Sequence, residues 1–200
     1  ALQDWSLAHP TVFWRAVWEF CGVRAQGDPD RVLVDAQRFP GAHWFPDVRL
    51  NFAENLLRCR DERPAIVSLL ENGQRRVLSY ADLYTQVAAL AAGMRRMGVQ
   101  AGDRVAGFLP NVAESVVAML ATASIGALWS SCSPDFGING VMDRFGQIEP
   151  KLLIAADGYY YNGRAHSSLE RVAAIAEALP TIERVGLVPV VSPQPELSAI

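Results

Sequence analysis

The sequence predicts an α/β fold in which helices cover both faces of a mainly parallel sheet. Short apolar segments alternate along the chain with helical segments of roughly ten to eighteen residues, which is the pattern of consecutive βαβ units. The apolar segment over 152–156 has no polar position, as a strand buried on both faces requires. Half of the 200 residues are hydrophobic and a fifth are charged, so the chain can bury a sizeable core.

An aromatic-rich lead segment, residues 1–60, precedes the regular alternation. Apolar residues over 11–21 recur at the spacing of one helix face, so an amphipathic helix is predicted there. A shorter helix is predicted over 51–58, with Asn51 as its N-cap. We therefore expect a lead segment packed on an α/β region that begins at residue 61.

The lead segment also contains a predicted loop over 38–47, because this stretch holds two prolines and a glycine. Three aromatic residues lie within it, namely Phe39, Trp44 and Phe45. Aromatic side chains bury a large apolar area when they pack. We expect all three to anchor the loop on the rest of the domain.

From residue 61 onward, predicted strands and helices alternate. The strands are expected over 64–70, 75–78, 104–109, 127–131, 151–155 and 183–188. A turn at 71–74 joins the first two strands, and Gly98 suits the position just after the first helix. One helix is expected over 141–148, and three others are expected to be capped by Ser79, Asn111 and Ser167, each with an acidic residue three positions on.

The stretch over 115–134 carries no charge and is long enough to cross a bilayer. Several serines and a threonine lie in it, and Gly126 interrupts it. A buried helix followed by a buried strand explains this composition better than a membrane span. We therefore expect no membrane partner.

Charge and cysteine content restrict the class of protein further. The formal net charge is -3 and no stretch collects basic residues, so a nucleic-acid partner is not expected. The three cysteines are far apart and form no disulfide or zinc pattern. With no secretory signal at the start, a cytoplasmic protein with reduced thiols is expected.

The familiar motifs of complete active sites are missing. The sequence holds no GxGxxG after a strand, no GxxxxGK[ST] loop, no GxSxG and no HExxH. Its histidines, His9, His43 and His166, have no spacing that suggests a shared metal or a catalytic triad. We assign no catalytic residue and no metal ligand in this chain.

A first candidate site follows the strand predicted over 127–131. Ser131, Ser133 and Asp135 lie there, where the carboxyl end of a buried strand leads into a helix. Ligands of open α/β sheets collect at such ends, and small residues let backbone N–H groups approach an anion. The alternative is a plain turn in which Ser133 or Asp135 caps the next helix, and the residues alone favour that alternative.

A second candidate follows the strand predicted over 151–155. Asn162 and Gly163 favour a tight turn, from which Arg164 projects on a loop and is free to bind phosphate bidentately. Tyr161 and its neighbouring tyrosines offer flat surfaces to an adenine or a thiol-bearing arm. A solvated arginine on a strand-to-helix connection is the alternative, and the residues alone do not decide between the two.

Several segments resemble the adenylate-forming enzymes, which include acyl-CoA synthetases. The first sequence block of that superfamily is matched by LSYADL at 78–83, GVQAGDRVA at 98–106, PNVAES at 110–115 and ATASIGA at 121–127. The run LNFAENLLR at 50–58 resembles the acetyl-CoA synthetase branch, and the segments over 129–145 and 161–164 resemble acetoacetyl-CoA synthetases. The resemblance implies that 61–200 is the first, incomplete α/β subdomain of the large amino-terminal domain.

The resemblance also implies a reaction. Acetoacetate and ATP give an acyl-adenylate and pyrophosphate, and CoA then displaces AMP, with Mg as the metal. The family's phosphate loop, nucleotide-binding segments and catalytic lysine lie beyond this chain, so the chain alone is expected to be inactive. In related enzymes two arginines of this turn contact CoA; Arg164 matches the second of them, whereas Tyr161 replaces the first. An acetyl- or propionyl-type synthetase and a stand-alone binding domain are the alternatives.

Overall fold

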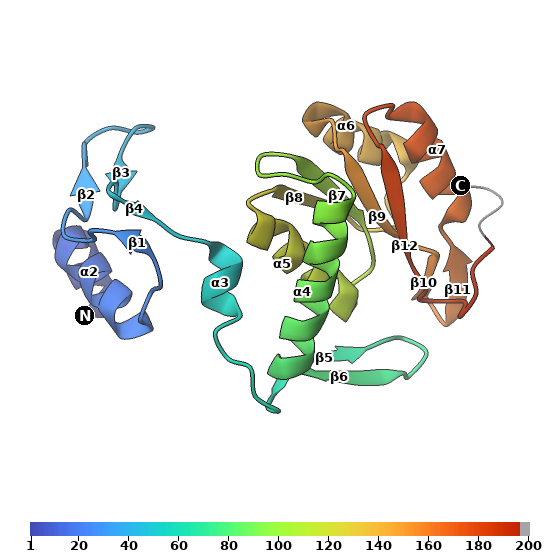
Figure 1. The fold of residues 1–200 in the computed structure, drawn as a ribbon, viewed down its shortest axis with the longest axis horizontal. Helices are drawn as coiled ribbons and strands as arrows, with labels where there is room; N and C mark the ends of the chain where they lie inside the picture. The colour runs from blue at the N-terminus through green and yellow to red at the C-terminus, as the bar shows by residue number, and fades with distance from the viewer. Residues whose placement is uncertain (197–200) are drawn as a thin grey trace. The chain divides into compact units, whose positions relative to one another are not determined.

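The structure is a computed structural model and describes residues 1–196. Two compact units divide the chain, the first Ala1–Asn55 and the second beginning at Leu56. The helices and strands that begin in the first unit are α1 Leu2–Ala8, α2 Pro10–Cys21, β1 Gln26–Gly27, β2 Leu33–Val34, β3 His43–Trp44, β4 Val48–Arg49 and α3 Phe52–Leu56. The strands form two small antiparallel pairs, β1 with β4 and β2 with β3 (Figure 1).

Two of the three loop aromatics anchor the loop as predicted. The ring of Trp44 meets that of Trp14 edge-on, with centroids 5.9 Å apart, and the ring of Phe45 lies 4.5 Å from that of Trp18. The expectation for Phe39 was wrong, because its side chain is fully exposed. Trp44 and Phe45 are held because α2 presents a tryptophan to each of them.

The second unit is built on a four-stranded parallel sheet of order β12-β9-β7-β8. Its strands are β7 Arg104–Phe108, β8 Leu128–Cys132, β9 Leu152–Ala156 and β12 Arg184–Val188. Helices α4 Tyr80–Arg96 and α5 Ala113–Ile125 cover one face, and α6 Ile138–Ile148 and α7 Leu169–Ala178 cover the other (Figure 1). The predicted α/β layering is confirmed.

Two hairpins stand apart from the parallel sheet. The first is β5 Pro64–Leu69 with β6 Arg75–Ser79, which the predicted strands and turn anticipated. The second is β10 Gly158–Tyr161 with β11 Arg164–Ser167. The second was expected only as a loop, because its strands are only four residues long.

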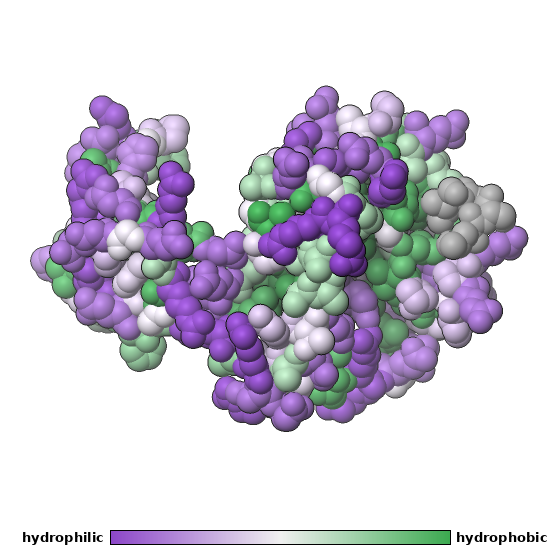
Figure 2. Space-filling model, viewed as in Figure 1, coloured by the Kyte–Doolittle hydropathy of each residue, from purple (hydrophilic) through white to green (hydrophobic). Residues whose placement is uncertain are grey.

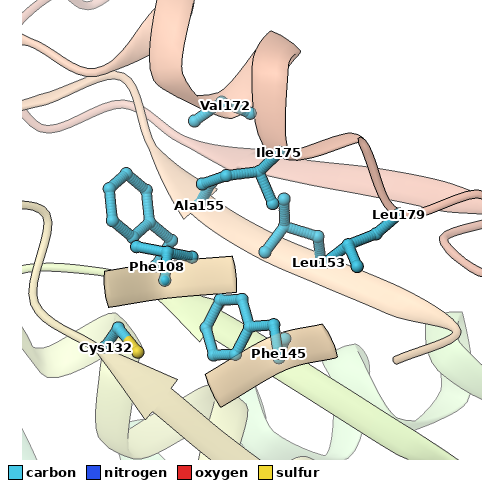
Figure 3. Packing of buried hydrophobic residues seen from close by; sticks show 10 residues of the cluster. Phe108, Cys132, Phe145, Leu153, Ala155, Val172, Ile175 and Leu179 are labelled. Carbon is cyan, nitrogen blue, oxygen red and sulfur yellow. The ribbon is translucent and has the colours of Figure 1, made fainter. Parts of the chain in front are cut away.

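The core on the α6 and α7 side is a cluster of apolar side chains together with one thiol. Phe108 of β7 and Leu153 of β9 meet Phe145 of α6 and Ile175 of α7, all with no exposed surface (Figure 3). Close packing of this kind fixes both helices on the sheet. The thiol belongs to Cys132 of β8, whose pKa is raised because burial disfavours the thiolate.

The uncharged stretch forms α5 and β8. The helix is buried as predicted, and Leu120 is only 2% exposed. The strand is only partly buried, because within residues 1–196 β8 is an edge of the sheet and pairs with β7 alone. Among the described residues, no helix is long and apolar enough to cross a membrane.

The helix caps agree with the sequence in two cases, Asn51 and Ser79, and differ in two. Asn111 does not cap α5, whose N-cap is Val112 with no side-chain hydrogen bond. Ser167 lies in β11, and the N-cap of α7 is Ser168, whose buried hydroxyl has no hydrogen-bond partner within residues 1–196. In the lead unit, Asn51 does cap α3, since its side-chain oxygen accepts from the backbone N–H of Glu54 at 3.1 Å.

The cap of α4 is complete. The hydroxyl of Ser79 accepts from the backbone N–H of Asp82 at 3.1 Å, and the Asp82 carboxylate accepts from the backbone N–H of Ser79 at 3.1 Å. This backbone donor and then the hydroxyl lower the pKa of Asp82. The bonds therefore contribute fully above the ordinary pKa of an aspartate and are lost as the pH falls through the lowered one.

Replacing Ser79 with alanine is expected to lower the free energy of unfolding by about 1 kcal/mol, because α4 loses a side-chain N-cap. Urea denaturation of the wild type and the Ser79→Ala variant measures the difference. Ser79→Thr keeps the hydroxyl and is expected to retain most of the stability. An alanine variant as stable as the wild type would contradict this role of the cap.

Candidate functional site

Both candidate segments leave the parallel sheet at its carboxyl edge. Ser131 is near the end of β8, and the hairpin β10–β11 begins two residues after β9 ends. Strands β8 and β9 both flank β7 in parallel, so their carboxyl ends point the same way. This is the edge at which open α/β sheets bind their ligands.

The hairpin joins its strands through Asn162 and Gly163. Both residues have positive φ, 50° and 70°, which is the conformation of a two-residue type I′ turn. The tight turn predicted from this Asn-Gly pair is therefore confirmed. It places Tyr161 and Arg164 opposite each other at the tip of the hairpin.

One face of the hairpin carries a row of rings that ends beside Arg164. The ring of Tyr159 stacks on the imidazole of His166 with centroids 5.2 Å apart, and Tyr161 lies 6.4 Å from the same imidazole. Residues directly opposite each other in an antiparallel pair project to the same face, and so do alternate residues of one strand. Arg164 therefore shares this face with Tyr159, Tyr161 and His166.

Arg164 itself is exposed, and Tyr161 beside it is 63% exposed. Within residues 1–196 no carboxylate lies within ion-pair distance of the Arg164 guanidinium. A guanidinium that is not neutralised and stands next to an exposed ring can bind a phosphate and support a planar group.

The turn after β8 does not cap the next helix. The N-cap of α6 is Gly137, without a side-chain hydrogen bond, so the simple capping role considered for Ser133 and Asp135 was wrong. Both side chains are exposed. Ser131 and Ser133 line an open cavity of about 280 Å³ between the carboxyl ends of β7 and β8.

A residue that the sequence did not single out connects the two segments. Arg171, in the first turns of α7, donates a hydrogen bond to the carbonyl oxygen of Pro134 at 2.6 Å. The carbon at the centre of its guanidinium lies 5.7 Å from the centroid of the Tyr159 ring, within reach of a cation–π contact. The sequence held no local signal for this link, because it depends on how α7 packs on the sheet.

The base of the hairpin is fixed by a buried carboxylate. Asp157 is 4% exposed and accepts backbone N–H bonds from Val190 at 2.7 Å, Val191 at 3.0 Å and Ser192 at 2.7 Å. The next residue is Gly158, where a Cβ atom would lie 2.3 Å from a backbone oxygen on the opposite strand. Only glycine fits there without moving the hairpin.

Residues 52–199 match the family model of AMP-binding enzymes. The chain belongs to the AMP-binding enzyme family. Residues 1–56 match the model of the acetyl-coenzyme A synthetase N-terminus.

Relatives of this AMP-binding enzyme chain are several-fold longer. Acetoacetyl-coenzyme A synthetase of Rhizobium meliloti (strain 1021) is 47% identical over 184 residues, which are 91% of this chain and 28% of that protein. Malonamoyl-CoA synthetase vrtB of Penicillium aethiopicum is 42% identical, over 92% of this chain and 26% of that protein. The solved structure of acetoacetyl-CoA synthetase from Streptomyces lividans superposes with a TM-score of 0.90 at 44% identity, over 96% of this chain and 30% of that one.

A larger cavity of this AMP-binding family member, about 370 Å³, lies beside the carboxyl ends of β7 and β12 and is lined by neither candidate segment. It is bounded by the β5–β6 hairpin, the start of α5 and the residues after β12. Arg76, which lines it, is already paired with Glu114. We favour the β10–β11 hairpin and the turn after β8 as the site, because within residues 1–196 Arg164 at the hairpin tip pairs with no carboxylate.

Proposed function

We propose that this chain is part of an ATP-dependent acid–CoA ligase. The enzyme joins acetoacetate to CoA through an acyl-adenylate and releases AMP and pyrophosphate. Support comes from the AMP-binding family and from relatives named acetoacetyl-CoA synthetases. The site residues we assign to this chain bind CoA, and the reaction takes place in the cytoplasm.

The observation that carries the CoA assignment is the face of the β10–β11 hairpin. CoA combines several phosphates with an adenine, and it needs a cation and flat apolar surfaces side by side. Arg164 supplies the cation, and Tyr161 supplies an exposed ring directly opposite it on the same face. Asn162 and Gly163 complete the site by forming the turn that aligns the two.

The turn with Ser131, Ser133 and Asp135 is assigned a secondary role as a ligand-proximal wall. Its two serines line the cavity at the end of β8. The remainder of the enzyme would provide most of the contacts to ATP and Mg. Within the described residues no group of three His, Cys, Asp or Glu side chains could hold a metal ion.

Malonamate is a second candidate acid. A relative named for malonamoyl-CoA is 42% identical to this chain, close to the 47% of a relative named for acetoacetyl-CoA. Sequences similar to this chain therefore occur in relatives named for two different 3-carbonyl acids. We place acetoacetate first, because the solved structure similar to this chain carries that name.

Thioester formation by the complete enzyme tests the proposal. Acetoacetate, malonamate, acetate and propionate are supplied separately with ATP, Mg and CoA, and acyl-CoA is measured by mass. Acetoacetate is expected to give the highest kcat/KM. Preference for acetate or propionate would replace acetoacetate as substrate, and the absence of any CoA thioester would leave a binding domain as the better account.

A further inference from the structure

We propose that Arg171 is a positioning residue that holds the β10–β11 hairpin against the turn after β8. By fixing the hairpin, it sets the place of Arg164 at the tip and so the affinity for CoA. This inference rests on the proposed function, since its effect on activity is expressed through CoA. The contacts of Arg171 with the turn and with the hairpin belong to the folded chain and do not depend on the identity of the substrate.

The first contact of Arg171 is with a buried backbone group. Pro134 has less than 2% of its surface exposed, and its carbonyl oxygen accepts from the Arg171 guanidinium at 2.6 Å. Buried carbonyls require a donor, and a charged donor makes a short, strong bond. The turn after β8 is therefore fastened to α7 by the Arg171 side chain.

The second contact is with the hairpin. The Arg171 guanidinium lies 5.7 Å from the ring centroid of Tyr159, and Tyr159 stacks on His166. The carbonyl oxygen of Tyr161 lies 3.3 Å from Nε2 of His166. The contacts thus form a continuous series from Pro134 through Arg171 and the rings to the tip.

The chemistry of this position requires arginine. A guanidinium donates hydrogen bonds in its plane while its face rests against a ring, whereas a lysine ammonium is a point charge on a flexible stem. Within residues 1–196, no carboxylate forms an ion pair with Arg171. Its charge is thus directed at a carbonyl and a ring, which suits a structural clamp between two segments.

Arg171→Ala in the complete enzyme is expected to raise the KM for CoA roughly tenfold, because only part of the free energy of its charge-assisted hydrogen bond and cation–π contact is transmitted through the hairpin to the CoA site. The rate of acetoacetate-dependent ATP–pyrophosphate exchange should fall much less. Arg171→Lys is expected to rescue only part of the CoA affinity. Arg75→Ala removes an exposed arginine from the other hairpin and serves as the matched control.

Hydrogen–deuterium exchange of the 158–167 segment provides a readout that does not need activity. Arg171→Ala is expected to speed exchange of these amides roughly tenfold, since the clamp no longer opposes local opening. The control variant should leave them unchanged. Unchanged exchange in Arg171→Ala would overturn the proposal.

A double-mutant cycle with Arg164→Ala completes the test. If Arg171 acts through the hairpin tip, its removal is expected to cost little further CoA affinity once Arg164 is gone. Fully additive losses, or faster exchange with no change in the KM for CoA, would overturn the positioning role and leave the ligase function standing. A wild-type enzyme that forms no CoA thioester would overturn the proposed function, and the role of Arg171 in CoA binding would then be overturned as well.

Discussion

Leu120→Asp is expected to lower the free energy of unfolding of the second unit by roughly 3–5 kcal/mol. Leu120 is 2% exposed on α5, a helix that packs along α4. The other buried residues of α5 offer no cation, since they are Ala113, Val117, Ala118, Ala121 and Thr122. The new carboxylate would be buried without a partner. Such a loss is large, because the whole free energy of unfolding of a domain is only about 5–15 kcal/mol.

Urea denaturation at two pH values distinguishes charge burial from simple loss of packing. Burial raises the pKa of the new aspartate in the folded state, so the loss of stability should be largest well above the ordinary pKa. It should shrink as the pH falls and the carboxyl becomes neutral in both states. Leu69→Asp places the same substitution on an exposed strand and is the control. A Leu120→Asp protein as stable as the control variant would show that α5 is not the buried helix described here.

The layered fold could be predicted because its signals are local. The apolar run of β9 requires burial on both faces, and the pairing of Ser79 with Asp82 marks where α4 begins. These signals depend on residues within one turn or one strand. The edge position of β8 could not be predicted, because strand order in the sheet is set by the packing of distant segments.

The site was predicted in part for the same reason. The backbone preferences of Asn162 and Gly163 predict a turn, and the structure has that turn. The hairpin around it was missed, although Tyr159 and Tyr161 alternate on one strand while Arg164 and His166 alternate on the other. That alternation was the available signal.

The remaining features of the site depend on tertiary contacts. Arg171 reaches Pro134 from a position 37 residues away in the sequence, so no local pattern reveals the bond.

The prediction that Asn111 caps α5 was wrong for a different, local reason. A capping residue was present, but the helix begins two positions later, at Ala113.

Arg164→Ala is expected to produce the largest effect on CoA use in the complete enzyme. A charge-assisted bond to phosphate corresponds to roughly a ten- to hundredfold change in affinity. The arginine is exposed, so solvent and salt should bring the change toward the lower figure. Formation of the acyl-adenylate should continue, because CoA enters only after that step.

The role of the hairpin tip in CoA binding is tested by the KM for CoA of Arg164→Ala, measured beside its acetoacetate-dependent ATP–pyrophosphate exchange rate. We expect a KM at least about tenfold higher than that of the wild type and the Arg75→Ala control, with the exchange rate nearly unchanged. Arg164→Lys should recover only part of the affinity, because an ammonium cannot bind phosphate bidentately. An unchanged KM for CoA, or equal losses in KM and exchange, would contradict the assignment of the hairpin tip as the CoA site.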